Sequence, residues 1–304
     1  YDDPKWDDLL NELKLSEMHA LFNKSGWGST AVDSIGKPKT LEFDAPHGIA
    51  NFLTGETLYS YPCATMLAAT WNQELQNEYG VTIGNDAIAS NTSGWYAPGI
   101  NIHRTPFGAR NYEYYSEDAM LTNRMALAFS KGNWKKGTFT VAKHFAMNDK
   151  ENNRTGLSTF FTEQSARENG LRAFQGLLTS EAGKGVMSAY NRIGTVFSGG
   201  HEGLMKQILR TEWGYDGWVV TDYAAAGFDY MNWLDNIYAG GGACLCTTAN
   251  YSSAAIGSMG DEKNRSVVLS DGAFQHEMQD ALKHFMYVFA SSNAMNGLSP
   301  DTKV

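Results

Sequence analysis

Cysteine is scarce in this chain, with three residues among 304, too few for a disulfide framework. Cys244 and Cys246 flank Leu245 in a short apolar stretch, and on a strand both side chains would point to one face. A zinc site needs more ligands than these two, and none lies nearby in the sequence. We therefore expect two small buried side chains there and no metal.

Basic residues are outnumbered, with 24 Lys and Arg against 33 Asp and Glu and a net charge of -9. Because phosphate binding needs clustered Lys and Arg, this balance argues against a nucleic-acid or anionic membrane partner and suits a neutral substrate. No run reaches the ~20 apolar residues that a membrane-spanning helix needs. The first four residues are neither basic nor apolar, so no signal peptide and a cytoplasmic location are expected. No pattern indicates an oligomeric state.

The sequence contains no internal repeat, low-complexity tract or Pro/Ser-rich linker. With 42% hydrophobic and 19% charged residues, the composition is that of an ordinary globular chain with a substantial core. We expect residues 1–304 to form one domain, in which residues 1–39 are a helix and loop that lead into it.

Short apolar or β-branched runs alternate with helical patterns along most of the chain. Strands are predicted at 40–43, 58–61, 94–100, 138–145, 185–189, 217–221 and 241–246, and helices at 6–22, 65–79, 118–134, 162–179, 202–212 and 273–290. This alternation is typical of a parallel sheet, and the number of units favours an α/β fold of the (β/α)8 barrel type. Seven strand candidates indicate that the barrel is irregular or lacks a strand.

Polar and ionisable residues cluster where the predicted strands end. They are Asp44, Lys143, His144, Tyr190 and Asp222. The C-terminal strand ends of such a barrel converge on one face, where active sites lie. This placement indicates an enzyme.

Three longer segments carry the chemistry. In the first, the apolar run 217–221 delivers Asp222 ahead of small residues, although an Asp at such a junction could equally cap a helix. In the second, residues 141–154, Lys143, His144 and Arg154 supply many hydrogen-bond donors, as a polyhydroxylated ligand requires. The third, residues 95–118, is a loop dense in aromatic and charged residues, and long ordered loops on barrels are usually functional.

These segments resemble the glycoside hydrolase family 3 patterns W-A-P-x-x-N-I-x-R-x-P-x-G-G-R-N-x-E-Y-Y-S-E-D, K-H-F-x-x-N-x-x-E-T-N-R and G-x-V-V-S-D-W, in family order. The segment 292–297 resembles the tail of members whose barrel follows an α/β sandwich domain. The resemblance implies a retaining β-glucosidase that needs no cofactor or metal. It would release β-D-glucose from the non-reducing end of β-glucosides or short oligosaccharides.

Residue by residue, the resemblance makes Asp222 the nucleophile that forms a covalent glycosyl intermediate. It implies that Asp44 grips hydroxyls at the non-reducing end of the sugar. The other positions that match the −1 subsite are Arg110, Lys143, His144, Arg154, Met187, Tyr190 and the aromatic Tyr223. Lys143 and Arg154, if close, would lower the pKa of Asp222 by favouring its charged form.

The sequence departs from the family at several positions. Ala45 replaces a Gly, Tyr223 a Trp and Asn152 a Thr. Ala50 stands where several members carry a sugar-binding Arg, which leaves β-xylosidase or another β-glycosidase activity open.

The partner acid/base is not identified by any motif. In the β-glucosidase branch it is a Glu on the sandwich domain, so the resemblance implies that another domain or chain supplies it. In-chain alternatives are Glu113, Glu117, Asp149, Glu151 and Asp229. The N-acetylhexosaminidase branch is disfavoured, because its K-H-F-P-G-H-G-D-type motif carries a His that this chain does not have. A non-catalytic sugar-binding or scaffolding subunit with the same barrel remains a second hypothesis.

Overall fold

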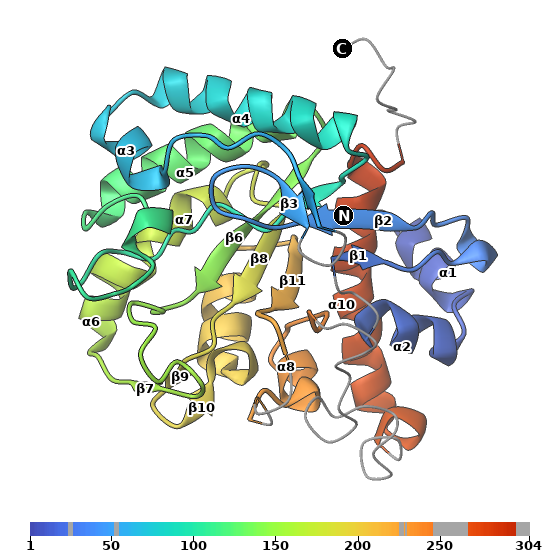
Figure 1. Cartoon of the computed structure of the whole chain (residues 1–304). Coiled ribbons are helices and arrows are strands. Elements are labelled where there is room, and N and C mark those ends of the chain that lie inside the picture. Colours follow the sequence, from blue (N-terminus) through green and yellow to red (C-terminus); the bar gives the residue numbers. More distant parts are fainter. Residues whose placement is uncertain (24–26, 52–54, 225–227, 229, 246–266, 296–304) are drawn as a thin grey trace.

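The computed structural model describes residues 1–23, 27–51, 55–224, 228, 230–245 and 267–295 (Figure 1). Within them the main sheet runs in the order β1-β2-β5-β6-β8-β11. Its strands are β1 (Gly28–Ser29), β2 (Thr40–Phe43), β5 (Gly94–Trp95), β6 (Phe139–Phe145), β8 (Gly185–Ser188) and β11 (Trp218–Thr221). β1 is antiparallel to β2, and all other neighbours are parallel. A parallel bridge from Val220 to Ala243 continues the order past β11.

Helices surround this sheet (Figure 1). The α-helices are α1 (Lys5–Asn11), α2 (Leu15–Asn23), α3 (Ala64–Ala69), α4 (Gln73–Ala89), α5 (Ala119–Trp134), α6 (Glu163–Ser165), α7 (Arg172–Leu178), α8 (Trp233–Tyr238) and α10 (Gly272–Ser291). The π-helical segments η3 (Ala166–Gly170) and η5 (Gly203–Glu212) and the 3-10 segments η1 (Asp33–Ile35), η2 (Asn111–Glu113) and η4 (Ser198–Gly200) complete the set. Short strands β3 (Ala50–Asn51), β4 (Glu56–Thr57), β7 (Ser158–Thr159), β9 (Arg192–Ile193) and β10 (Val196–Phe197) form two small sheets. No helix in the described ranges is long and apolar enough to cross a membrane.

The predicted α/β class is confirmed, and the fold resembles a TIM barrel. A closed eight-stranded barrel is not what the described residues form, because their main sheet has six strands. The predicted strand 58–61 is wrong: Leu58 N–H and Tyr61 N–H donate to the carbonyls of Ile49 and His47, so the segment pairs with the loop after β2. Of the strand predicted at 94–100, only the two residues of β5 form a strand. Residue 246 of the last predicted strand lies outside the described residues.

Two predicted helices are each split in two. The N-terminal pattern at 6–22 forms α1 and α2, and the pattern at 65–79 forms α3 and α4. The second break has a local cause, because Trp71 has φ 54° and the Asn72 side chain caps the new helix by accepting from the N–H of Leu75.

Strands β6, β8 and β11 are buried along their whole length, as expected for parallel strands with both faces covered. Their side chains alternate between two hydrophobic cores. Phe139 and Trp218 pack with Phe285 and Phe289 of α10, whereas Phe145 packs with α7 on the other face. This rigid centre fixes where the strand ends lie.

Candidate active site

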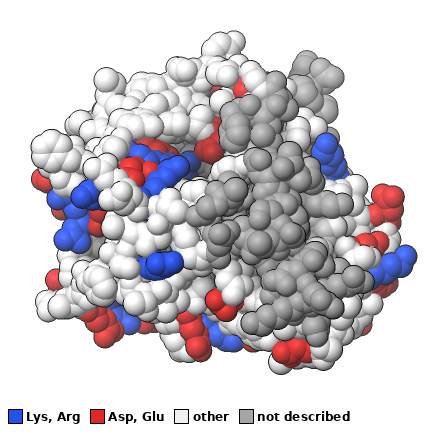
Figure 2. Space-filling view, turned by 60° about the horizontal axis from the view of Figure 1, so that its bottom comes forward, with Lys and Arg blue, Asp and Glu red and all other residues white. Residues whose placement is uncertain are grey.

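The strand-end residues predicted from the sequence converge on one cleft of about 550 Å³. Asp44, Lys143, Tyr190 and Asp222 line it, whereas His144 lies behind its wall. The remaining lining residues are Trp27, Ala45, Pro46, Ala50, Arg110, Tyr112, Glu113, Glu151, Arg154, Tyr223 and Leu245. Figure 2 shows a hollow in which basic and acidic side chains gather, on the face toward which the parallel strands point in Figure 1.

Asp222 follows the last residue of β11 and is 8% exposed. Its Oδ1 accepts a hydrogen bond from the N–H of Tyr223 at 2.7 Å. Its Oδ2 has no hydrogen-bond partner among the described residues and lies 3.4 Å from Nε2 of His144. The next described helix, α8, begins eleven residues later at Trp233, so Asp222 does not cap it.

Lys143 and Arg154 lower the pKa of Asp222, as expected from the sequence, but the expectation left out burial, which decides the net direction. Burial raises this pKa to about 6, and it outweighs Arg110, the Tyr223 N–H, Lys143 and Arg154, which all lower it. The carboxyl is therefore mostly ionised at pH 7, with a proton affinity well above that of an exposed Asp.

Lys143 lies on β6 and is 3% exposed. Its Nζ donates to Oδ1 of Asp44 at 2.9 Å and lies 3.2 Å from Oε1 of Glu113. Burial lowers the pKa of this ammonium, but the charges of Asp44 and Glu113 raise it more, so the net shift is upward. Asp44 also accepts from the N–H of Ala45, which closes the turn after β2.

Glu113 ends the short segment η2 and holds a second cation. Its Oε2 accepts from Nε of Arg110 at 2.6 Å and its Oε1 from Nη2 at 2.9 Å. Burial would raise the pKa of Glu113, but Lys143 and Arg110 hold it down at about 2. The Glu113 carboxylate is therefore ionised near neutral pH, and its two oxygens contact Arg110 and Lys143.

The charges continue across the cleft in alternating sign. Arg110 Nη1 lies 3.6 Å from Oε1 of Glu151, and Arg154 Nη1 donates to Oε2 of Glu151 at 2.8 Å. The guanidinium of Arg154 also stands over the ring of Tyr190, 4.8 Å from its centroid. The order from one wall to the other is Asp44, Lys143, Glu113, Arg110, Glu151 and Arg154.

Aromatic side chains form the rest of the wall. Tyr190 donates its hydroxyl hydrogen to the carbonyl of Tyr223 at 2.7 Å, next to Asp222. The ring of Tyr223 packs against Trp27, with centroids 5.3 Å apart. Met187 lies on β8, is buried in a hydrophobic core and is not among the residues that line the cleft, so its predicted place in the sugar site stays a prediction.

The proposed in-chain acids fit the cleft poorly. Glu113 and Glu151 line it but are held by Arg110, Lys143 and Arg154. Glu117 is exposed away from it. Asp149, whose pKa burial raises to about 6, lines a different small cavity. Asp229 lies outside the described residues.

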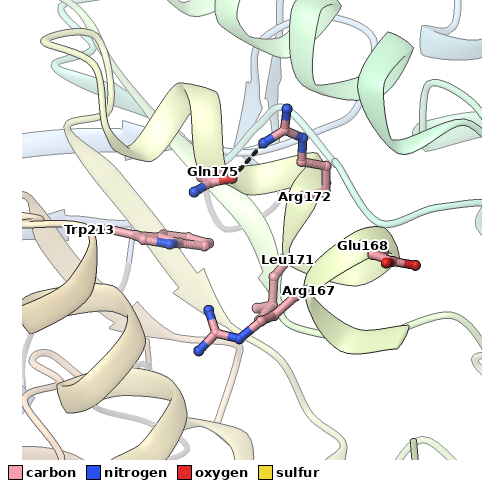
Figure 3. Close-up of a pocket in the computed structure, with 6 residues that line it drawn as sticks. All are labelled: Arg167, Glu168, Leu171, Arg172, Gln175 and Trp213. Atoms are coloured by element: carbon pink, nitrogen blue, oxygen red, sulfur yellow. Dashed lines mark hydrogen bonds between the residues drawn. The ribbon is translucent and has the colours of Figure 1, made fainter. Parts of the chain in front are cut away.

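A second hollow of about 420 Å³ lies on the outside of the fold, between η3, α7 and the end of η5 (Figure 3). Its two arginines already have partners: Arg167 forms ion pairs with Glu163 and Glu212, and Arg172 donates a hydrogen bond to Gln175. None of the predicted site residues lines it, so the cleft at the strand ends is the candidate active site. In the part of the chain that is described, no three His, Cys, Asp or Glu side chains gather as a metal site would require.

Sequence reasoning missed Trp27, Tyr112 and Leu245 as lining residues. Trp27 lies in a segment that is predicted as a loop and carries no motif, so no signal pointed to it. Tyr112 lies inside the loop 95–118, which was predicted to be functional, so its place in the cleft could have been predicted from that loop. The replaced positions Ala45 and Ala50 do line the cleft.

Comparison with known proteins agrees with this geometry. The family model described as "Glycosyl hydrolase family 3 N terminal domain" matches residues 20–237. Beta-glucosidase A of Butyrivibrio fibrisolvens is 35% identical over 238 residues, which is 75% of this chain and 28% of that protein. A beta-glucosidase of Rhizobium radiobacter is 34% identical over 71% of this chain and 27% of its own length. The chain thus spans about a quarter of these relatives.

The structure resembles that of beta-glucosidase 3B from Thermotoga neapolitana in complex with alpha-D-glucose. The TM-score is 0.87 at 27% identity, over 98% of this chain and 44% of that one. A beta-glucosidase from Bifidobacterium adolescentis gives a TM-score of 0.82 at 26% identity, over 96% and 41%. The matched segment includes every residue of the cleft except Leu245. The chain belongs to glycosyl hydrolase family 3.

Proposed function

We propose that this chain supplies the nucleophile and the sugar subsite of a retaining β-glucosidase. The observation that carries the proposal is Asp222, a buried carboxylate at the end of a strand, in a cleft lined by hydrogen-bond donors; one of its oxygens accepts no hydrogen bond from the described residues. The relatives named beta-glucosidases support this substrate class.

In the proposed reaction, Asp222 attacks the anomeric carbon of a β-glucoside. The bond to the leaving oxygen breaks, that oxygen takes a proton from an acid, and a glycosyl ester forms on Asp222. Water then attacks the ester, and the former acid accepts the proton of that water as a base. The product is β-D-glucose with its configuration retained.

The charged side chains of the cleft would bind the sugar hydroxyls. Asp44 accepts hydrogen bonds, whereas Lys143, Arg110 and Arg154 donate them. Each already has an ionic partner, so a hydroxyl can be added without leaving a buried charge unpaired. His144, Tyr190 and Tyr223 complete the site around Asp222.

The acid/base is proposed to be a Glu from another domain or chain. Support comes from the engagement of Glu113 and Glu151 with cations. A proton donor must hold a proton near neutral pH, and a carboxyl whose pKa is held at about 2, as in Glu113, does not.

A 2-fluoro glucoside with an activated aryl leaving group tests the nucleophile, because such a leaving group needs little protonation. Mass spectrometry after incubation is expected to show one added 2-fluoroglucosyl group on the peptide that contains Asp222. Asp222→Ala is expected to abolish it. An adduct on any other residue would contradict the assignment.

A non-catalytic sugar-binding subunit is the second candidate, favoured by the engagement of both Glu side chains in the cleft. It predicts saturable glucose binding with no adduct. The matching 2-fluoro xyloside is a further comparison, because the cleft has Ala50 where several family members carry a sugar-binding Arg. Faster labelling by the xyloside than by the glucoside would indicate a β-xylosidase instead.

A further inference from the structure

A line of hydrogen bonds behind the cleft ends at Asp222. Its first member is the ion pair of Glu151 with Arg154. A carboxylate held by a guanidinium only accepts hydrogen bonds, so the atom of Asn148 that lies 3.0 Å from Oε1 of Glu151 must be the amide nitrogen. This contact fixes which way the buried Asn148 amide points.

The same nitrogen of Asn148 lies 3.3 Å from the hydroxyl oxygen of Tyr114. One amide hydrogen serves Glu151, and the other is donated to Tyr114. Because the Tyr114 oxygen then accepts, its own hydrogen is available for the next contact, which is Nδ1 of His144 at 3.1 Å. Tyr114 is 2% exposed, so the structure leaves little room for solvent to compete.

The ring of His144 is equally constrained. It is 1% exposed, and burial together with the charges of Arg110, Lys143 and Arg154 holds its pKa well below the ordinary value. Its backbone is clamped by Asn101, which accepts from its N–H at 2.7 Å and donates to its carbonyl at 2.9 Å. A neutral imidazole carries one proton, and the hydrogen bond at one nitrogen decides which nitrogen holds it.

We propose that Tyr114 is a positioning residue that fixes the tautomer of His144, with the proton on Nε2, so that an N–H faces Oδ2 of Asp222. Asn148 sets the direction of the Tyr114 hydroxyl, and Glu151 sets the direction of Asn148. The opposite tautomer would turn a nitrogen lone pair toward the carboxylate at 3.4 Å, which repels its negative charge. The hydrogen bonds from Glu151 to His144 thereby favour the ionised form of Asp222, because the Nε2–H of His144 faces its carboxylate.

The tautomer can be measured without any substrate. Long-range proton–nitrogen correlation NMR on the chain labelled with ¹⁵N at histidine separates protonated from unprotonated ring nitrogens, and the signal missing from a His144→Gln variant assigns the ring. At pH 7 Nε2 of His144 is expected at the protonated position and Nδ1 at the unprotonated one. The reverse pattern would overturn the proposal, and this spectrum needs no variant at position 114.

Tyr114→Phe removes the hydroxyl and keeps the ring. Both His144 nitrogen signals are then expected to move toward intermediate positions, because the two tautomers mix. Tyr115→Phe is the matched control: this neighbour is also buried, but its hydroxyl accepts from Gln76 at 2.8 Å, away from the cleft. Unchanged His144 signals in Tyr114→Phe, or equal shifts in both variants, would contradict the proposed role.

The consequence for rate rests on the proposed function. Labelling of Asp222 by the 2-fluoro glucoside is expected to slow by about 10- to 100-fold in Tyr114→Phe, the range known for groups that orient histidines in metal sites. Glucose affinity is expected to change less. If wild type forms no adduct, the proposed function fails and the NMR result still stands. If wild type is labelled and Tyr114→Phe is labelled equally fast, the positioning role fails alone.

Discussion

At the scale of single residues, Glu113 shows how one buried carboxylate can organise a cleft. Its carboxylate forms ion pairs with both Arg110 and Lys143, and both cations are largely hidden from solvent. Its side chain packs closely against Gly99, where an added Cβ would lie 3.0 Å from Cγ of Glu113 and 2.8 Å from the ring of Tyr114.

Glu113→Gln keeps the shape of the side chain and removes its charge. Removing one partner of a buried ion pair typically costs 3–5 kcal/mol, so we expect a loss of about 3 kcal/mol in the free energy of unfolding, measured in urea. Glu117→Gln, at an exposed position in the same loop, is the control and should change stability little. Equal stability of the two variants would show that the bidentate contact contributes nothing.

The raised pKa of Asp222 predicts a pH dependence of labelling. Attack requires the ionised carboxylate, so the rate of adduct formation should be nearly constant above pH 7. Below the pKa of about 6 it should fall, approaching tenfold per pH unit. Mass spectrometry at a series of pH values measures this limb. A midpoint near 4, the ordinary value for Asp, would mean that the cations outweigh burial.

Several site residues were predictable because they sit in motifs or at strand ends. Asp44, Lys143, Tyr190 and Asp222 were found in this way, and all line the cleft. Trp27 was not predicted as a site residue, because its contact with Tyr223 joins positions nearly two hundred residues apart. Nothing local to either position encodes that contact.

At the scale of elements, buried strands and long helices were predicted well, and short or split elements were not. The apolar runs of β6, β8 and β11 predict them to within a residue or two. The run 58–61 is also short and was predicted as a strand, but its backbone partners lie in the loop after β2. Which partner a short apolar run selects is a tertiary property, so composition alone misassigns it.

The packing of α4 on α5 depends on two glycines. A Cβ at Gly80 would lie 2.1 Å from the carbonyl oxygen of Phe129, and one at Gly132 would lie 2.0 Å from that of Asn77. These obstacles are backbone atoms, so the helices themselves would have to separate.

We therefore expect Gly132→Ala to destabilise the fold by about 1–3 kcal/mol, the usual cost of overpacking. Gly272→Ala is the matched control. It begins α10, and a Cβ there meets nothing within 4 Å, so the better helix propensity of Ala should leave stability equal or slightly higher. Urea unfolding of both variants decides the point.

At the scale of the whole molecule, a buried polar chain ties the N-terminal segment to the sheet. Lys37 donates to Oγ of Ser29 at 2.7 Å, the hydroxyls of Ser29 and Thr40 lie 2.5 Å apart, and Thr40 donates to Glu42 at 2.9 Å. Burial raises the pKa of Glu42 to about 7 and lowers that of Lys37 to about 8. These hydrogen-bonded side chains therefore include two groups, Glu42 and Lys37, that titrate near neutral pH.

Glu42 should make stability depend on pH. Because its pKa is raised on folding, its contribution is fully present below the ordinary value of 4.5 and is lost as the pH rises through about 7. Wild type should lose on the order of 2–3 kcal/mol relative to Glu42→Gln between pH 5 and pH 8. Urea unfolding of the pair at both values tests this. A constant difference would show that Glu42 does not titrate in this range.

The alternation of charge from Asp44 to Arg154 has a consequence for the conditions under which the cleft works. Its three cations already form ion pairs with three of its anions in the absence of a ligand. Binding of an uncharged sugar should therefore neither release nor take up counterions. Affinity for glucose should therefore be nearly independent of ionic strength, in a protein whose overall charge is -9.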